Sequence, residues 1–341
     1  MDTINKPISK KIDFLRTLMI VFVLFIHNTN TISGVKEQLP VFWLIQQINL
    51  FLFSPAVPLL YFISAYLLFM KKRNYWEIIK KRIRQILVPF LLWPTIILIL
   101  YLSFNYKNIR SYDFIDYLDA YLGVLNRKGM LLPHFWFLRD LFILTLLYPI
   151  FSKNKVLDFI IFCLAIIWWL SGKSFIIGYN SLFYYMLGYF AAKYNFSWYV
   201  NKTKKTVLFF IISLLLSITG IIFTYLWKDL VIMQNLIIIS LGIFYIIIAN
   251  YCIGNFWEKL KKYSFWIYCI HLPILMTVFI KALAKMCNLE AISLVIKNIT
   301  IVLGYYLIPV ITIAIAIYFA KLLCFICPRG YALLSGERKY T

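Results

Sequence analysis

Acidic residues are scarce in this chain, and charged residues of either sign are few. Its 341 residues contain 13 Asp and Glu against 35 Lys and Arg, and 14% of all residues are charged. Hydrophobic residues make up 63%, a share well above that of soluble globular domains. The composition therefore excludes an ordinary soluble enzyme and predicts a protein that folds in lipid.

Paired cysteines, internal repeats and flexible linkers are also missing. The six cysteines are scattered, without the spacing of a secreted disulfide framework. Cys324 and Cys327 form a lone C-x-x-C pair with no second pair or histidine beside it, so we predict no metal site. Residues 1–341 are expected to form one transmembrane domain with no soluble domain. The missing repeat disfavours a secondary transporter, because many such folds contain two related halves.

Long apolar runs dominate the sequence. Runs of roughly 18 to 25 residues can cross a bilayer as helices, and runs such as 207–224 lack the alternation of barrel strands. We therefore predict an all-α, polytopic membrane bundle of about ten transmembrane helices. The predicted spans are 14–31, 48–70, 86–104, 134–152, 155–171, 174–192, 205–227, 230–250, 263–283 and 299–325.

The basic residues follow the predicted spans unevenly. Most of the 35 Lys and Arg fall in alternate connections, above all in 71–84. Positively charged connections resist translocation, so this distribution places both termini in the cytoplasm. The charge therefore sets topology and attracts anionic membrane lipid. It does not indicate a nucleic-acid partner, because no exposed aromatic platform accompanies it.

The longest polar connection, 105–133, is predicted to lie outside the membrane. Asp113, Asp116 and Asp119 recur there at three-residue spacing. This pattern predicts a short amphipathic helix at the membrane surface, with its acidic face in water.

Ionisable residues inside spans are costly, so they are the natural candidates for function. In the first span, eleven positions separate Arg16 from His27, which places both on one helix face about 16 Å apart. Asp13 lies one turn before Arg16 and is expected to orient it or to pair with it. A snorkelling arginine and a histidine bonded to a neighbouring helix would explain the same residues without chemistry.

A second group opens the fourth span, in the segment His134-Phe135-Trp136-Phe137-Leu138-Arg139-Asp140. Adjacent residues point to different helix faces, so Arg139 and Asp140 are expected to find partners on other helices rather than each other. They are expected to line a polar cavity. Structural ion pairs between helices are the alternative explanation.

Two further candidate sites lie in the basic connection 71–84 and in the ninth predicted span, 263–283. Lys81 and Arg84 lie in a run of cations suited to phosphate groups, although topology alone would also explain that run. His271 is placed near the middle of the membrane, two residues before Pro273, whose missing N–H frees a backbone carbonyl. A histidine bonded across helices is the alternative for His271.

Together these motifs resemble the membrane acyltransferase family 3, in particular its stand-alone surface-polysaccharide O-acyltransferases. The resemblance covers nearly the whole chain. Its usual basic motif is Arg-x2-Arg, so Lys81 departs from it and lacks the planar fork of arginine. The motifs that carry it are Arg16-x10-His27, Lys81-x2-Arg84, Pro-Leu-Leu-Tyr-Phe-Ile-Ser (58–64), 134–141 and Tyr268-x2-His271-x-Pro273.

The resemblance implies an acyl-CoA donor in the cytoplasm, with acetyl-CoA as the leading candidate. It also implies a carbohydrate acceptor outside, either free or lipid-linked. His27 is then the expected general base, assisted by Arg16 and Asp13, while Arg16, Lys81 and Arg84 hold the CoA phosphates. The hydrolase-like domain of some relatives is not expected, so transfer would finish in the membrane part or on another protein. The expected acceptor-binding residues are His134, Trp136, Arg139, Asp140 and His271.

Several alternatives stay open at this stage. Transfer could be direct, or could pass through a covalent intermediate on Ser264, Cys269 or His27. An exporter or flippase for a polysaccharide or lipid-linked sugar is the main competing function. The composition suggests a bacterial, multi-pass protein of the cytoplasmic membrane. It names neither the acceptor sugar nor the oligomeric state.

Overall fold

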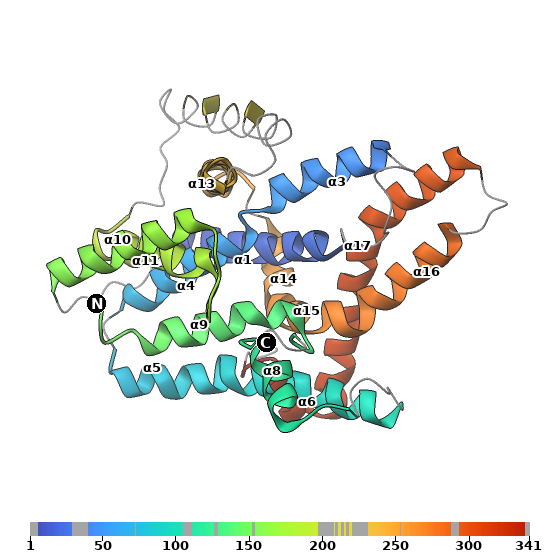
Figure 1. The fold of residues 1–341 in the computed structure, drawn as a ribbon, viewed down its shortest axis with the longest axis horizontal. Helices are drawn as coiled ribbons and strands as arrows, with labels where there is room; N and C mark the ends of the chain where they lie inside the picture. Colours follow the sequence, from blue (N-terminus) through green and yellow to red (C-terminus); the bar gives the residue numbers. More distant parts are fainter. Residues whose placement is uncertain are drawn as a thin grey trace. The chain divides into compact units, whose positions relative to one another are not determined.

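The computed structural model is helical throughout the part of the chain that it describes, and contains no strand there (Figure 1). The predicted all-α class is thus confirmed. The chain divides into two compact units, Met1–Ile63 with Asn195–Tyr318 and Ser64–Tyr194 with Phe319–Thr341. The described residues are 6–28, 40–71, 73–104, 111–125, 129–151, 154–196, 208, 211–212, 215, 218–219, 231–252, 254–287 and 293–337.

The first unit is organised around its N-terminal helix. This helix, α1, buries Ile12, Leu15, Met19 and Val23, which recur every three or four residues along one face. α1 packs on α3, α14, α15 and η5. The elements are α1 (Lys6–His27), α3 (Pro40–Phe53), α4 (Ala56–Phe69), α13 (Val231–Ile248), α14 (Asn255–Leu260), the 3₁₀ turn η4 (Lys261–Tyr263), α15 (Ser264–Ile270), the π-helical turn η5 (His271–Met276), α16 (Thr277–Cys287) and α17 (Leu294–Ile326), of which α4 and α17 continue into the second unit.

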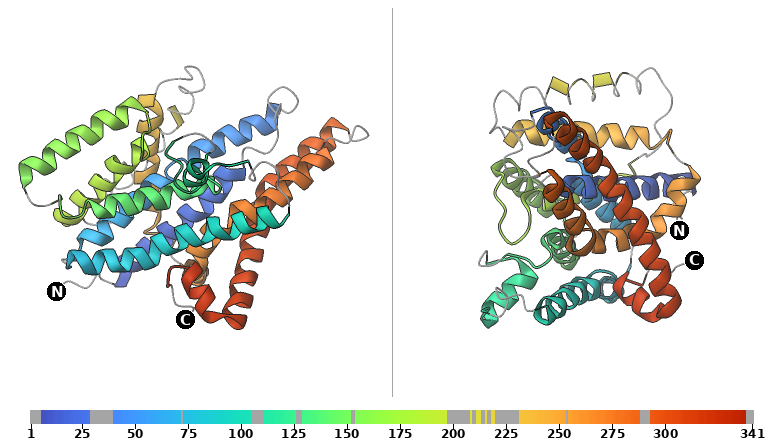
Figure 2. Two further views of the ribbon diagram at one scale, coloured as in Figure 1. Left: turned by 60° about the horizontal axis from the view of Figure 1, so that its bottom comes forward. Right: turned by 90° about the vertical axis from the view of Figure 1, so that its right-hand side faces the viewer.

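The second unit contains a long rod and an antiparallel pair. α5, η2 and α6 follow one another as one continuous rod, and α10 lies beside α11 (Figures 1 and 2), with Trp169 stacked on Phe183 at 4.2 Å between ring centroids. The elements are α5 (Tyr75–Arg82), the π-helical turn η2 (Ile83–Leu87), α6 (Val88–Ser103), α8 (Phe114–Leu122), the 3₁₀ turn η3 (Pro133–Phe135), α9 (Trp136–Leu146), α10 (Lys155–Ser171), α11 (Tyr179–Lys193) and α18 (Pro328–Leu334).

Among the residues that the structure describes, four helices are long and apolar enough to cross a membrane, which makes this a multi-pass membrane protein. They overlap four predicted spans. Three of them begin earlier than predicted, at Phe42, Tyr75 and Leu294 instead of positions 48, 86 and 299, so the rod takes in the basic run around Lys81. The predicted span 205–227 lies mostly outside the described residues. The total of ten spans and the cytoplasmic termini stay predictions. The four helices are Phe42–Phe69, Tyr75–Ser103, Val231–Ile248 and Leu294–Ile326.

Prolines explain both π-helical turns. Pro89 and Pro273 have no N–H, so each removes one i→i−4 hydrogen bond from its helix. Near Pro89 the N–H of Val88 reaches the carbonyl of Ile83 instead, which widens the helix by one residue. One π turn therefore contains Arg84, and the other begins at His271.

The predicted short helix in the 105–133 connection is present as α8, but most of its acidic side is buried. Asp113 accepts a hydrogen bond from the N–H of Asp116 at 2.6 Å in a capping box, and Asp119 accepts one from the N–H of Leu125 at 2.7 Å. Asp116 and Asp119 are buried, while Asp113 is exposed and Phe114 is 76% exposed. The expected solvated face was therefore wrong for Asp116 and Asp119, because their carboxylates satisfy backbone donors.

Candidate active site

The structure brings two of the three histidines together in the first unit. His27 is the last residue of α1, and His271 is the first residue of η5. Their ring centroids lie 5.3 Å apart with the planes inclined by 40°. His271 is fully buried and His27 is half-buried. Sequence spacing linked His27 to Arg16, but it did not predict this pairing of imidazoles.

A backbone carbonyl orients His271. The Nδ1 atom of His271 lies 2.7 Å from the carbonyl oxygen of Tyr268, one turn earlier. A carbonyl oxygen only accepts, so Nδ1 must carry the hydrogen and donate. In a neutral ring, Nε2 is then the basic nitrogen. The bond fixes both the plane and the tautomer of this imidazole.

The N-terminal half of α1 is tied down by two ion pairs. Lys10 contacts Glu258 at 2.7 Å, and Asp13 contacts Lys261 at 2.8 Å. Asp13 also lies close enough to Arg16 for a favourable charge interaction. The direct partner of Asp13 is therefore Lys261, a residue that the sequence did not single out, because nothing local connects positions 13 and 261.

The candidate covalent nucleophiles of the first unit have defined surroundings. The hydroxyl of Ser264 donates to the carbonyl of Lys261 at 2.9 Å. Cys269 is a buried thiol outside any disulfide. The contact of Ser264 with a backbone carbonyl is not that of a nucleophile activated by a base.

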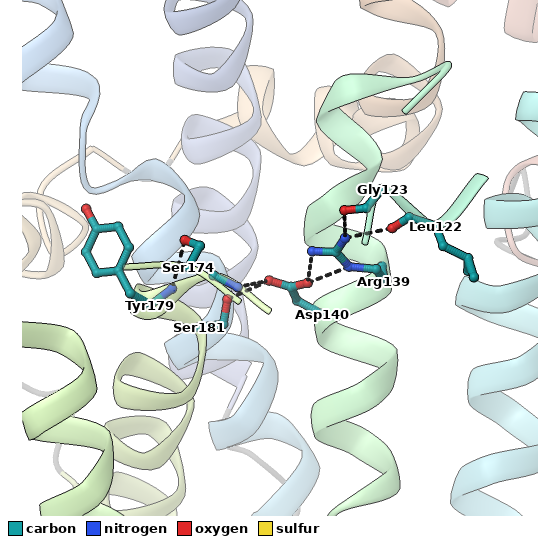
Figure 3. Close-up of polar contacts among 8 residues, drawn as sticks. Leu122, Gly123, Arg139, Asp140, Ser174, Tyr179 and Ser181 are labelled. Atoms are coloured by element: carbon teal, nitrogen blue, oxygen red, sulfur yellow. Dashed lines mark hydrogen bonds and ion pairs between the residues drawn. The ribbon is translucent and has the colours of Figure 1, made fainter. Parts of the chain in front are cut away.

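In the second unit, Arg139 and Asp140 pair with each other. Nε and Nη2 of Arg139 lie 3.0 and 2.8 Å from Oδ1 of Asp140 (Figure 3). The expectation that adjacent residues would avoid each other was wrong, because the long arginine side chain folds back to its neighbour. Both residues also reach other segments, as expected.

These other contacts connect three segments of the chain. Nη1 of Arg139 donates to the carbonyls of Leu122 and Gly123, at the end of α8. Oδ2 of Asp140 accepts from the N–H of Gly178 at 2.7 Å and from the hydroxyl of Ser181 at 2.8 Å, at the start of α11 (Figure 3). Asp140 is fully buried. Four of the five guanidinium N–H groups are used within the protein, so this cluster acts first as a structural clasp.

Sequence reasoning missed Gly178 and Ser181. A Cβ atom added at Gly178 would lie 3.1 Å from the Ser181 hydroxyl and 3.4 Å from Asp140 Oδ2. The absence of a side chain lets the backbone N–H approach the carboxylate. The only sequence signal was the position of Gly178 directly before α11.

Trp136 is the first residue of α9, and His134 lies in the 3₁₀ turn η3 just before it. His134 is buried, and its ring packs edge-on to Phe135 at 4.7 Å between centroids. The Trp136 ring reaches within 3.4 Å of a Cβ built at Gly178. Of these two predicted acceptor-binding residues, Trp136 therefore lies beside the backbone that contacts Asp140.

Of the three predicted phosphate-binding residues, Lys81 and Arg84 are exposed in the second unit, whereas Arg16 is half-buried on α1 in the first unit. Lys81 interacts electrostatically with three other cations, Arg73, Arg82 and Lys71. Arg84 contacts Glu337 at 3.5 Å, and both side chains are largely exposed. The basic run is therefore a real cluster of like charges, which favours an anionic ligand.

A further polar cluster joins α10 to α11. Asp158 accepts hydrogen bonds from Lys193 at 2.7 Å and from Tyr189 at 2.6 Å. Lys193 lies just beyond the predicted span, and its hydrogen bonds to Asp158 and Tyr189 raise the pKa of its ammonium group. This pair is structural, since each charge meets its opposite.

Comparison with known proteins places the chain in a family. The acyltransferase domain family matches residues 9–327, nearly the whole chain. The chain is similar to the succinoglycan biosynthesis protein ExoH of Rhizobium meliloti (strain 1021), at 26% identity over 365 residues, 97% of this chain and 93% of that protein. No solved structure matches the chain. The chain belongs to the acyltransferase family 3 that its motifs predicted, and it is an acyltransferase that draws on an acyl donor.

Proposed function

We propose that this protein is a membrane O-acyltransferase. It moves an acyl group, with acetyl as the leading candidate, from cytoplasmic acyl-CoA to a hydroxyl of an extracytoplasmic glycan. Membership of the acyltransferase family supports the reaction class. The name of ExoH ties that relative to succinoglycan biosynthesis, which supports a surface polysaccharide or its lipid-linked precursor as acceptor, and hence the cytoplasmic membrane. The observation that carries the proposal is the His27–His271 pair on the same unit as Arg16.

In the proposed reaction, the acceptor oxygen attacks the thioester carbonyl while His27 takes the hydroxyl proton. The carbon–sulfur bond then breaks, and the thiolate of CoA leaves with that proton as a thiol. A neutral imidazole suits this task because the ordinary pKa of an imidazole lies near neutral pH. No covalent enzyme intermediate is required.

The donor is held by cations. Arg16 lies about 16 Å along α1 from His27, by the rise of eleven helical residues. Its neighbour Asp13 makes its ion pair with Lys261 rather than with Arg16, which supports an anionic ligand for Arg16. As the family resemblance implies, we assign Arg16, Lys81 and Arg84 to the phosphates of CoA.

The residues of the second unit that were expected to bind the acceptor are assigned two roles. His134 and Trp136 are assigned to acceptor contacts, where an aromatic ring offers an apolar face to a sugar. Arg139 and Asp140 are assigned to positioning these residues, because most of their hydrogen-bonding capacity is used within the protein. This assignment reduces the number of acceptor-binding residues that were expected from the sequence.

The test uses purified protein in nanodiscs with radiolabelled acetyl-CoA and a surface-glycan acceptor. We expect label in the glycan, and no transfer by His27→Ala. The matched control is Cys252→Ser, at an exposed site four residues beyond the end of α13, which should transfer at the wild-type rate. An exporter would neither transfer nor hydrolyse the acyl group, and that result would reject the proposal.

A further inference from the structure

We propose that Asn28 is a positioning residue for His27. Its side-chain amide anchors the C-terminal end of α1 to α17, and this anchor holds the imidazole of the preceding residue in place for proton transfer. The inference rests on the proposed function, since it concerns the same base. Asn28 was not among the residues that the sequence singled out.

The anchor is a long-range hydrogen bond inside the first unit. Nδ2 of Asn28 donates to the backbone carbonyl of Tyr305 at 2.7 Å, across 277 positions of the chain. Asn28 and Tyr305 are each only 1% exposed. A carbonyl oxygen only accepts, so the amide nitrogen must face it, which fixes the orientation of the Asn28 side chain. A bond buried to this extent is strengthened by its apolar surroundings.

Pro309 explains why this carbonyl is available to Asn28. In an α-helix, the carbonyl of each residue accepts from the N–H four positions later. For Tyr305 that position is Pro309, which lies inside α17 and has no N–H. The Asn28 amide takes the place of the missing donor. Because a buried carbonyl without a donor is costly, Asn28 and Pro309 complement each other.

The place of His27 in α1 makes an anchor necessary. His27 is the last residue of this helix. The final turn of a helix lacks intrahelical partners for its carbonyls, and helix ends fray. A general base must stay within hydrogen-bond reach of the proton that it takes. A base at a helix end therefore needs support from outside its helix, and its chain neighbour Asn28 supplies it.

The other contacts of α1 leave this task to Asn28. The two ion pairs described above fix the N-terminal half of the helix. Near its C-terminal end, Phe25 packs against Tyr305 at 6.0 Å between ring centroids. Apolar packing of this kind is non-directional, whereas a hydrogen bond depends on angle as well as distance. The Asn28 bond therefore sets the position of the last turn of α1 along α17.

Two substitutions remove the anchor, and a second buried asparagine offers a matched control. Asn28→Ala deletes the amide, and Asn28→Asp keeps its shape but replaces the donor nitrogen by an oxygen. Asn49 is also buried, and its Nδ2 donates to the hydroxyl of Tyr306 at 2.9 Å. Asn49→Ala therefore deletes an amide that links α3, and not α1, to the same turn of α17.

We expect both Asn28 variants to lower kcat by about 10- to 100-fold with KM for acyl-CoA unchanged, because a misplacement of about 1 Å can cost about 100-fold in rate. Asn49→Ala should melt at a lower temperature but transfer at close to the wild-type rate. Wild-type kcat in the Asn28 variants would overturn the proposal. So would an equal loss of kcat in Asn49→Ala, because any lost contact with α17 would then have the same effect.

Replacing Pro309 separates anchoring from satisfaction of the carbonyl. Pro309→Ala gives α17 an N–H for the Tyr305 carbonyl, which has two lone pairs and can still accept from Asn28. In that background, Asn28→Ala should cost less stability than in the wild type. It should still lower kcat by about the same factor, relative to Pro309→Ala alone. Disappearance of both effects would assign Asn28 to helix structure and overturn the proposal.

NMR of isotope-labelled histidine tests the inference without catalysis. The chain contains three histidines, so protein purified without a histidine tag gives few signals, and His27→Ala identifies the signal of His27. Asn28→Asp should shift or broaden that signal, and Asn49→Ala should leave it in place. An unchanged His27 signal in Asn28→Asp would reject the positioning role. A wild-type protein that transfers no acyl group would reject only the proposed function.

Discussion

The histidine pair and the Arg139–Asp140 clasp are both polar groups set in apolar helices, yet they satisfy their polarity differently. In the clasp, opposite charges meet, and backbone carbonyls, a backbone N–H and a hydroxyl use most of the remaining capacity. In the pair, one imidazole lies beside another, and the backbone carbonyl of Tyr268 orients His271. An ionisable residue within a span is therefore not a reactive site by itself. Reactivity requires a group whose protonation can still change.

The largest expected difference between the two regions is catalytic. His27→Ala should lower kcat by about 10²- to 10⁴-fold, the usual loss of a general base, with little change in thermal stability. Single-turnover transfer from labelled acetyl-CoA measures the rate, and melting in detergent measures the stability. A protein that melts early but transfers normally would reverse the comparison.

The clasp should show the opposite behaviour. Asp140→Ala is expected to lower stability by about 3–5 kcal/mol, because it leaves the Arg139 charge without its partner and removes acceptors for Gly178 and Ser181. Thermal unfolding followed by fluorescence-detected gel filtration measures the loss. The matched control, Glu77→Ala, removes an exposed carboxylate on α5 and should be neutral. If both variants melt alike, the clasp contributes no stability.

A smaller effect is expected when the clasp loses one donor. Ser181→Ala should cost about 1.5–3 kcal/mol, the range for a hydrogen bond to a charged group. Ser103→Ala is the control, because its exposed hydroxyl only bonds back to Ile99 within α6. Equal melting temperatures for the two variants would remove Ser181 from the clasp.

The smallest expected effect concerns the donor side. Arg84 contacts Glu337 at 3.5 Å on an exposed surface, where such pairs contribute about 0–1 kcal/mol. Glu337→Gln should therefore lower KM for acyl-CoA by at most a few-fold, by releasing Arg84 to the phosphates. Arg84→Gln should raise KM. Unchanged KM in Arg84→Gln would exclude Arg84 from donor binding.

Much of the local structure could be predicted from the sequence. Apolar runs predicted helices that the described residues contain, and three spaced aspartates predicted α8. The proline at 273 predicted a disturbed helix at His271. The orientation of α8 could not be predicted, because periodicity shows that aspartates share a face but not whether that face meets water or backbone donors.

Contacts between distant residues were the part that sequence reasoning could not supply. The Asp13–Lys261 pair joins residues 248 positions apart, and Asp140 reaches Gly178 across 38 positions. Arg139 was expected to avoid Asp140, because helix geometry places neighbouring Cβ atoms apart. That geometry says nothing of a long side chain that turns back toward its neighbour.

The sequence by itself determined that this protein folds in a lipid bilayer, that it is helical and which family motifs it carries. The reason is that the length of apolar runs, capping residues and prolines act within a few residues of the chain. Only the tertiary structure decided which polar groups neutralise each other and which two rings face each other. Those outcomes depend on helix packing, which selects one set of partners from many that the same helical faces would allow.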